Sequence, residues 1–255
     1  MSVAVPSTRP KLGLALWVAG MLGFSLITFT VLPDLLPTIL QGRELPFPIW
    51  AISTLGLLQA AILLAVAVWA GVATAHSVGL RAPVFESVVG GTPVLPHLKQ
   101  AFAPGLGFGL LVGVFLLCAN TYGPEAWVQS QAGYYPSLAV RIFYGVVTEE
   151  VLLRWGLLST VLWVLWRIFQ KGRGTPRSYL PWIAIILSAL LFGLAHLPAV
   201  SIQLGGLTGS VAVFIVGANA ITGIAFGWLY WRYGLETAMI AHALAHIVNY
   251  AFSAA

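Results

Sequence analysis

Seven long apolar segments constrain the fold of this chain more than any other feature of its sequence. They cover residues 12–32, 49–75, 102–120, 138–168, 180–197, 207–232 and 236–253. A helix needs about 20 mostly apolar residues to cross the hydrocarbon core of a bilayer, and none of these segments alternates as a barrel strand does. The sequence therefore predicts an all-α, polytopic transmembrane helix bundle with 7 spans, or 8 if the long sixth segment divides into two helices.

The composition points to the same class of protein. Hydrophobic residues make up 59% of the 255-residue chain and charged residues only 7%, whereas a soluble domain carries about 25% charged residues. So few charges cannot cover a water-facing surface, and we predict a single membrane domain over residues 1–255. The first apolar segment is longer than the ~7–15 apolar residues of a signal peptide, so we interpret it as the first span.

The basic residues predict how the bundle lies in the membrane. With seven spans, alternate loops on one side hold nine of them, whereas the other side holds Arg43 and Arg141. Loops rich in Lys and Arg stay cytoplasmic, so we expect a multi-pass protein of the cell membrane with a cytoplasmic N-terminus. No basic run with interleaved aromatics points to a nucleic-acid partner. The nine residues are Arg9, Lys11, Arg81, Lys99, Arg167, Lys171, Arg173, Arg177 and Arg232.

Two adjacent carboxylates and an arginine interrupt the fourth apolar segment, in the stretch GVVTEEVLLRWG that begins at Gly145. A charge at bilayer depth costs at least ~2.5 kcal/mol on insertion scales, and such residues usually serve a function. Glu150 and Arg154 are four residues apart on a helix and can pair. Glu149 points about 100° away, so it is left free to act as a general base. The alternative is structural, with the ion pair and a protonated Glu149 fixing helix packing.

Histidines and amides lie in three later apolar segments. His196 follows Phe192 by one helical turn in FGLAHLP, and a single histidine of this kind is more often a hydrogen-bonded core residue than a catalyst. His242 and His246 share a face in IAHALAHIVNY, and each needs a polar partner in lipid. For Asn219, in GANAITG, we favour a hydrogen bond between helices over a place in a cavity wall.

Motif searches leave one chemical arrangement. The sequence has no His-Glu-x-x-His zinc motif, and its only aspartate is Asp34. In this order, TEEVLLRWG, FGLAHLP and GWLYWRYGLETAMIAHALAH resemble the CAAX-protease and bacteriocin-processing (CPBP) family of intramembrane glutamic endopeptidases. The family pattern is Glu-Glu-x-x-x-Arg, then Phe-x-x-x-His, then His followed four residues later by Asn or Asp. The resemblance covers a catalytic core of about residues 138–250.

This resemblance implies an intramembrane endopeptidase that hydrolyses a peptide bond of a membrane-associated substrate. Glu149 is then the base that activates water, and His196 helps to hold that water. His242 polarises the scissile carbonyl and supports the oxyanion, a contribution of several kcal/mol when the donor is preorganised.

The remaining site residues include one departure from the family pattern. Glu150 pairs with Arg154 in the family, as the helix geometry indicates independently, and Phe192 belongs to the histidine motif. At the last motif position His246 replaces the family's Asn or Asp. An imidazole can still donate a hydrogen bond, and Asn249, almost one turn further on, is the alternative source of an amide.

The resemblance implies a metal-free enzyme, and we expect no cofactor. Zinc is the alternative, with His196, His242 and Glu149 as ligands, because two histidines and one carboxylate form a known catalytic set. The expected partners are a peptide or protein substrate and the lipid bilayer, with the oligomeric state left open. Two other functions stay open: a catalytically silent membrane immunity or interaction protein of the same fold, and a proton-coupled transporter with a Glu and His relay.

The sequence does not establish whether Glu149, His196 and His242 lie at the same depth in the membrane. Counting back from Trp166, taken as the inner boundary, places Glu149 near the outer end of the hydrocarbon core. His196 agrees with that depth. His242 lies early in the last apolar segment and so nearer the inner side.

Overall fold

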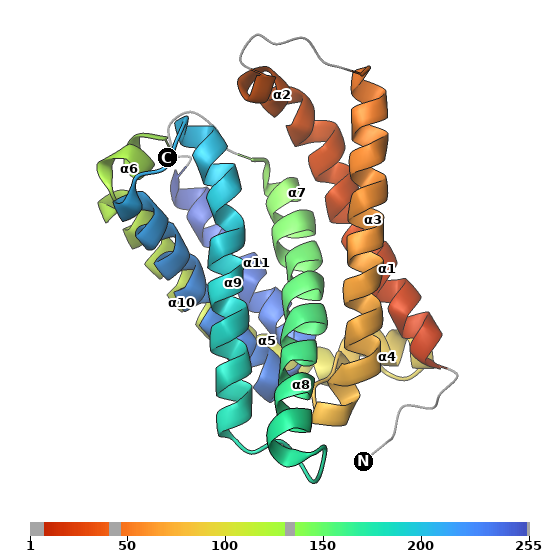
Figure 1. Cartoon of the computed structure of the whole chain (residues 1–255). Helices are drawn as coiled ribbons and strands as arrows, with labels where there is room; N and C mark the ends of the chain where they lie inside the picture. Colours follow the sequence, from red (N-terminus) through yellow and green to blue (C-terminus); the bar gives the residue numbers. More distant parts are fainter. Residues whose placement is uncertain (1–7, 41–46, 131–135, 254–255) are drawn as a thin grey trace.

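The computed structural model describes residues 8–40, 47–130 and 136–253, and these residues form helices and connecting segments without a β-strand (Figure 1). The predicted all-α class is confirmed for this part of the chain. The elements, in order, are α1 (Arg9–Leu26), η2 (Ile27–Val31), α2 (Leu32–Leu40), α3 (Ile49–Thr74), η3 (Ala75–Val78), α4 (Pro83–Gly90), α5 (Leu95–Tyr122), α6 (Glu125–Ser130), α7 (Leu138–Val140), η4 (Arg141–Thr148), η5 (Val151–Leu158), α8 (Ser159–Gln170), α9 (Tyr179–Leu204), α10 (Gly209–Tyr233) and α11 (Leu235–Ser253).

Within the described residues, six helical stretches are long and apolar enough to cross a membrane: Arg9–Leu36, Ile49–Val78, Leu95–Tyr122, Leu138–Gln170, Tyr179–Leu204 and Gly209–Tyr233. The chain is therefore that of a multi-pass membrane protein, although the predicted count of 7 or 8 spans is not confirmed. The sixth segment forms one continuous helix, α10. The seventh forms α11, which has 19 residues but is not among the six because its His, Asn and Glu residues lower its hydropathy.

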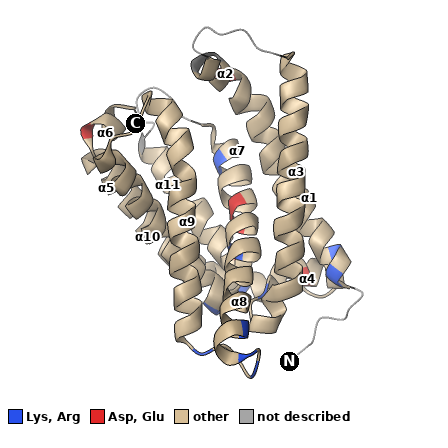
Figure 2. Cartoon of the chain, in the orientation of Figure 1, with Lys and Arg blue, Asp and Glu red and all other residues tan. Residues whose placement is uncertain are grey.

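Lys and Arg residues gather at one end of the bundle, around the start of α1, α4 and the loop between α8 and α9 (Figure 2). We call this the basic end, defined by the nine residues assigned above to one side of the membrane. Arg43, which the sequence assigns to the opposite side, lies outside the described residues.

One long helix, from Leu138 to Gln170, runs through the middle of the bundle, and we call it the central helix. It lies between α1 and α3 on one side and α9 and α11 on the other (Figure 1). Thr148 donates a hydrogen bond to the carbonyl of Gly20 on α1 (2.7 Å). The buried indole of Trp155 donates to the carbonyl of Val68 on α3 (3.3 Å). These contacts fix the rotation of the helix just before and after its two glutamates.

Glycines let α11 approach α5 at backbone distance. Gly105, Gly109 and Gly113 recur every fourth residue and face α11. A Cβ atom built on Gly109 would lie 2.7 Å from the carbonyl oxygen of Ala241, well inside van der Waals contact. The small-residue spacing thus serves helix packing, and it holds the residue before His242 against α5.

Candidate active site

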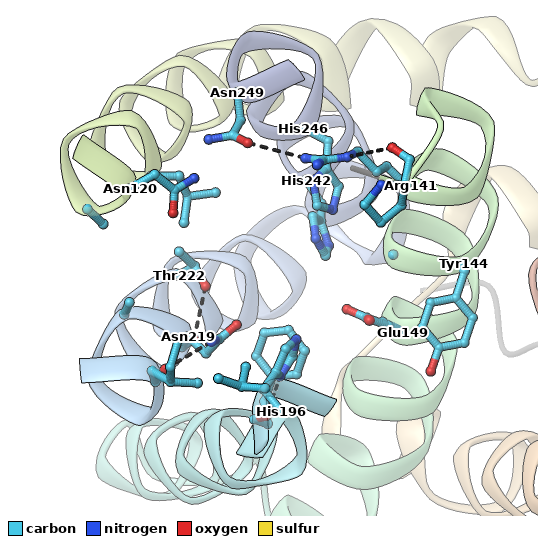
Figure 3. A pocket seen from close by; sticks show the side chains of 18 of the residues that line it. Asn120, Arg141, Tyr144, Glu149, His196, Asn219, Thr222, His242, His246 and Asn249 are labelled. Atoms are coloured by element: carbon cyan, nitrogen blue, oxygen red, sulfur yellow. Dashed lines mark hydrogen bonds between the residues drawn. The ribbon is translucent and has the colours of Figure 1, made fainter. Parts of the chain in front are cut away.

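A cavity of about 380 Å³ opens between the central helix, α5, α9, α10 and α11. Its wall is mostly apolar, but a set of polar side chains converges on it from these helices (Figure 3). The sequence-predicted Glu149, His196, His242 and His246 are all part of this wall. The polar lining residues are Asn120, Arg141, Tyr144, Glu149, His196, Gln203, Asn219, Thr222, His242, His246 and Asn249.

The two adjacent glutamates have different environments. Glu150 is fully buried and lies outside the cavity lining, and its Oε1 is 3.2 Å from Nη1 of Arg154, which is 3% exposed. This is the ion pair that the four-residue spacing predicts. Glu149 is only partly buried and faces the cavity from the central helix (Figure 3). One carboxylate is therefore neutralised inside the helix packing, and the other meets the space in which a substrate could lie.

His242 is held by Glu150. Its Nδ1 lies 2.8 Å from Glu150 Oε1, so the same oxygen serves both the imidazole and Arg154. The ring is stacked between Phe226 (centroids 4.6 Å apart) and His246 (4.7 Å). A carboxylate partner and two flat neighbours leave the ring little freedom, and Nε2 is the nitrogen that Glu150 does not use.

His196 is oriented by its own helix. Its Nδ1 donates a hydrogen bond to the carbonyl of Phe192 (2.8 Å), because a carbonyl can only accept. In a neutral ring Nε2 then keeps its lone pair and can accept a hydrogen bond. The Phe192 ring lies edge-on to His196 (4.5 Å between centroids) and 5.2 Å from the Arg154 guanidinium. Phe192 thus spaces the histidine from the buried arginine.

At one end of the cavity His246 and Asn249 meet Arg141. Nη1 of Arg141 donates to Oδ1 of Asn249 (3.2 Å), and its Nε donates to the carbonyl of Pro136 (3.2 Å) (Figure 3). His246 packs so tightly against the central helix that a Cβ atom on Gly145 would lie 2.7 Å from His246 Nε2. His246, which replaces the family's Asn or Asp, thus fits against the central helix because Gly145 has no side chain.

Residues 131–248 match the model of a family described as type II CAAX prenyl endopeptidase Rce1-like. This region of the chain is similar to the Rce1-like family. The match is consistent with the CPBP resemblance, and the Rce1-like family is a protease family. A search of curated proteins and a search of solved structures each found no match.

The Rce1-like region contains Glu149, Glu150, Arg154, Phe192, His196, His242 and His246, whereas Asn249 follows its last matched residue. The central helix, α9, α10 and most of α11 are thus the part of the bundle that carries the family match. The first half of the chain supplies α1, α3 and α5, which buttress this region.

Five polar cavity residues of the Rce1-like region were not predicted as site residues: Arg141, Tyr144, Gln203, Asn219 and Thr222. Arg141 carries a charge inside an apolar segment, which is a signal for a functional residue. The charge count instead placed it among the basic residues of one membrane side. Asn219 lines the cavity, and its Nδ2 donates to the carbonyl of Ile215 on its own helix (2.9 Å). The interpretation of Asn219 as a bond between helices is therefore wrong. Thr222 has no sequence signal, because a lone threonine in a helix is common.

A metal site is the other chemistry considered for these side chains. Among residues 8–40, 47–130 and 136–253, no group of three His, Cys, Asp or Glu side chains is arranged to hold a metal ion. The three candidate ligands His196, His242 and Glu149 are not arranged as a metal site in the described residues, and the reaction proposed for this site does not involve a metal.

Proposed function

We propose that this protein is an intramembrane endopeptidase that hydrolyses a peptide bond with water activated by Glu149. The observation that carries the proposal is the separation of the two glutamates. Glu150 is tied to Arg154 and His242, whereas Glu149 faces a cavity that it shares with three histidines. The match to the model of a protease family supports the same reaction class.

In the proposed reaction, Glu149 takes a proton from a water molecule that attacks the scissile carbonyl carbon. The lone pair on Nε2 of neutral His196 accepts the other hydrogen of that water and orients it. Glu149 then returns the proton to the leaving amine as the C–N bond breaks. General base and general acid catalysis of this kind contribute roughly 10²–10⁴-fold to the rate.

His242 is the proposed donor to the oxyanion. Because Nδ1–H is given to Glu150, the ring can donate from Nε2 only when both nitrogens carry protons. Arg154 and Glu150 hold the ring in place without touching the substrate, so we regard them as positioning residues. His246, stacked on His242, supports the same ring in place of the family's Asn or Asp.

We propose a substrate whose C-terminus enters the cavity toward Arg141. This guanidinium lies eight residues before Glu149 on the central helix, at most about 12 Å along its axis. An extended peptide spans about 3.3–3.6 Å per residue, so about three residues fit between the cleaved bond and a carboxylate held by Arg141. The amides of Asn120, Gln203 and Asn219 line the same cavity.

The direct test compares Glu149→Gln with Glu125→Gln, in which the altered carboxylate lies on α6 and accepts a hydrogen bond from Gln129. Both proteins are purified in detergent and assayed on a quenched fluorescent peptide with a free C-terminus. We expect Glu149→Gln to lower kcat at least about 100-fold, with unchanged thermal unfolding, and Glu125→Gln to cleave at the wild-type rate. A chelator such as 1,10-phenanthroline is expected to leave the wild-type rate unchanged.

Other outcomes would separate the rival functions. Cleavage by Glu149→Gln at the wild-type rate would end the glutamate mechanism. A cellular phenotype that survives Glu149→Gln but is lost in Arg154→Ala would favour a silent immunity or interaction protein. Proton flux into reconstituted vesicles that disappears in the Glu149 variant would favour a transporter.

A further inference from the structure

A second cavity, of about 550 Å³, lies at the basic end, away from the site described above. It is enclosed by the first residues of α1 and α5, by η3, and by α4 with the loops beside it. Three of the candidate spans begin or end at this cavity, namely Arg9–Leu36, Ile49–Val78 and Leu95–Tyr122. A cavity at the ends of three spans lies at the depth of the lipid headgroups.

The wall of this cavity is basic. Arg9, Arg81, His76 and His97 line it, together with the hydroxyl groups of Ser87 and Thr92 among others. Glu86 is the carboxylate among the described lining residues, and it already accepts hydrogen bonds from its neighbours. Two arginines against one glutamate leave one net positive charge, even with both histidines neutral.

The partners of Glu86 account for both of its oxygens. Oε1 accepts hydrogen bonds from the backbone N–H of Ala82 (2.9 Å) and from His76 (Nε2, 3.0 Å). Oε2 accepts from Nε of Arg81 at 2.8 Å and from its Nη2. The carboxylate therefore needs no external cation, and Arg9 and His97 add donors that Glu86 does not engage in the described structure.

We propose that this cavity binds a phosphate group, supplied by the headgroup of an anionic phospholipid. Arginine and histidine donors with nearby hydroxyls are suited to phosphate oxygens, and an anionic headgroup reaches the cavity at its own depth in the bilayer. The first turns of α1 and α5, both described, hold no acidic residue, so their helix dipoles add to the positive potential. The bound lipid joins α1, α4 and α5 at one end of the bundle. This inference does not depend on the proposed protease activity.

The test measures lipid-dependent stability of the full chain in an uncharged detergent. Phosphatidylglycerol, phosphatidylcholine or inorganic phosphate is titrated in, and the thermal unfolding temperature is followed by tryptophan fluorescence. The variants are Arg9→Gln and His97→Gln. The matched control is Arg177→Gln, which removes an arginine from the basic end but outside the cavity lining. Arg9 is an exposed first-turn residue, so its replacement should not prevent folding.

We expect saturable stabilisation of the wild type by phosphatidylglycerol and less by phosphatidylcholine. Half-saturation should rise about fivefold in Arg9→Gln, rise also in His97→Gln, and stay unchanged in Arg177→Gln. Equal protection by millimolar inorganic phosphate, with the same dependence on Arg9, would support the phosphate site but assign it to a free anion. Equal weakening by Arg9→Gln and Arg177→Gln, or unsaturable and equal effects of both lipids, would overturn the proposal.

Discussion

A single oxygen atom, Oε1 of Glu150, connects the buried arginine to the histidine of the cavity. Arg154 and His242 both lie within 3.2 Å of it, and Nη2 of Arg154 also donates to the carbonyl of Gly223 on α10 (3.3 Å). The spacing in the sequence was sufficient to predict the pair of Glu150 with Arg154. It was not sufficient to predict His242 as the third member, because that contact depends on how far each helix extends along the membrane normal.

Replacing Arg154 should therefore lower the stability of the folded protein, in addition to any effect on the cleavage rate. In Arg154→Met the carboxylate of Glu150 stays buried without its cation, a change that typically costs about 3–5 kcal/mol. We expect a large fall in the thermal unfolding temperature in detergent, and no fall in Arg177→Gln. Wild-type stability in Arg154→Met would mean that the ion pair does not support the central helix.

The contact of Gly145 with His246 gives a second test at this scale. In Gly145→Ala the new methyl group would lie 2.7 Å from His246 Nε2, so the imidazole has to shift, at a cost of about 1–3 kcal/mol. We expect slower cleavage in Gly145→Ala and recovery in Gly145→Ala combined with His246→Asn, whose side chain is smaller. Equal losses with and without the second substitution would show that the two positions do not interact.

The element that carries the glutamates has an unusual helical geometry. The backbone is π-helical in η4 and again in η5, with Glu149 and Glu150 between the two stretches. Wide turns of this kind are rare and occur frequently at functional sites. The length of the fourth apolar segment predicts a helix. No residue pattern in that segment distinguishes π-helical turns from ordinary α-helical ones. The predicted ion pair still forms because Glu150 ends the short ordinary stretch and Arg154, four residues later, lies in the first turn of η5.

Two glycines of α5 offer a matched pair of substitutions at the scale of helix packing. A Cβ atom on Gly109 would meet the backbone carbonyl of Ala241, whereas one on Gly107 has no atom within 4 Å. Alanine should thus stabilise α5 by up to about 1 kcal/mol at Gly107 but push α11 away at Gly109. We expect thermal unfolding and the cleavage rate to fall in Gly109→Ala only. Identical behaviour of the two variants would contradict the close packing of α5 with α11.

For the whole molecule, polar contacts at the basic end link elements far apart in sequence. Glu86 on α4 contacts His76 on η3, and Glu236 at the start of α11 accepts a hydrogen bond from the backbone N–H of Phe85 (2.9 Å). Seven helical segments, three motifs and the fold class follow from apolar length and residue spacing. This cluster does not, because no spacing rule brings Glu236 to a segment about 150 residues earlier in the chain.

The cluster makes stability depend on pH. Burial by itself would raise the pKa of Glu86, but hydrogen bonds from His76, Arg81 and the Ala82 N–H outweigh it and lower the pKa to about 2. A folded-state pKa below the ordinary value of 4.5 stabilises the protein fully at higher pH, and this stabilisation is lost as pH falls from about 4.5 toward 2. We expect the unfolding temperature to fall between pH 6 and pH 3. Glu86→Gln should be less stable at pH 6 and show a flatter profile, and parallel profiles would contradict this.

The division of labour between two neighbouring glutamates also bears on how related sequences are read. A chain that keeps the equivalents of Glu150 and Arg154 but has lost Glu149 would retain the scaffold and lack the reactive group. One letter of a six-letter motif would then separate hydrolases from inert homologues that share their shape. Genome surveys that score the whole motif together would merge these two groups, whereas inspecting its first position alone would sort them.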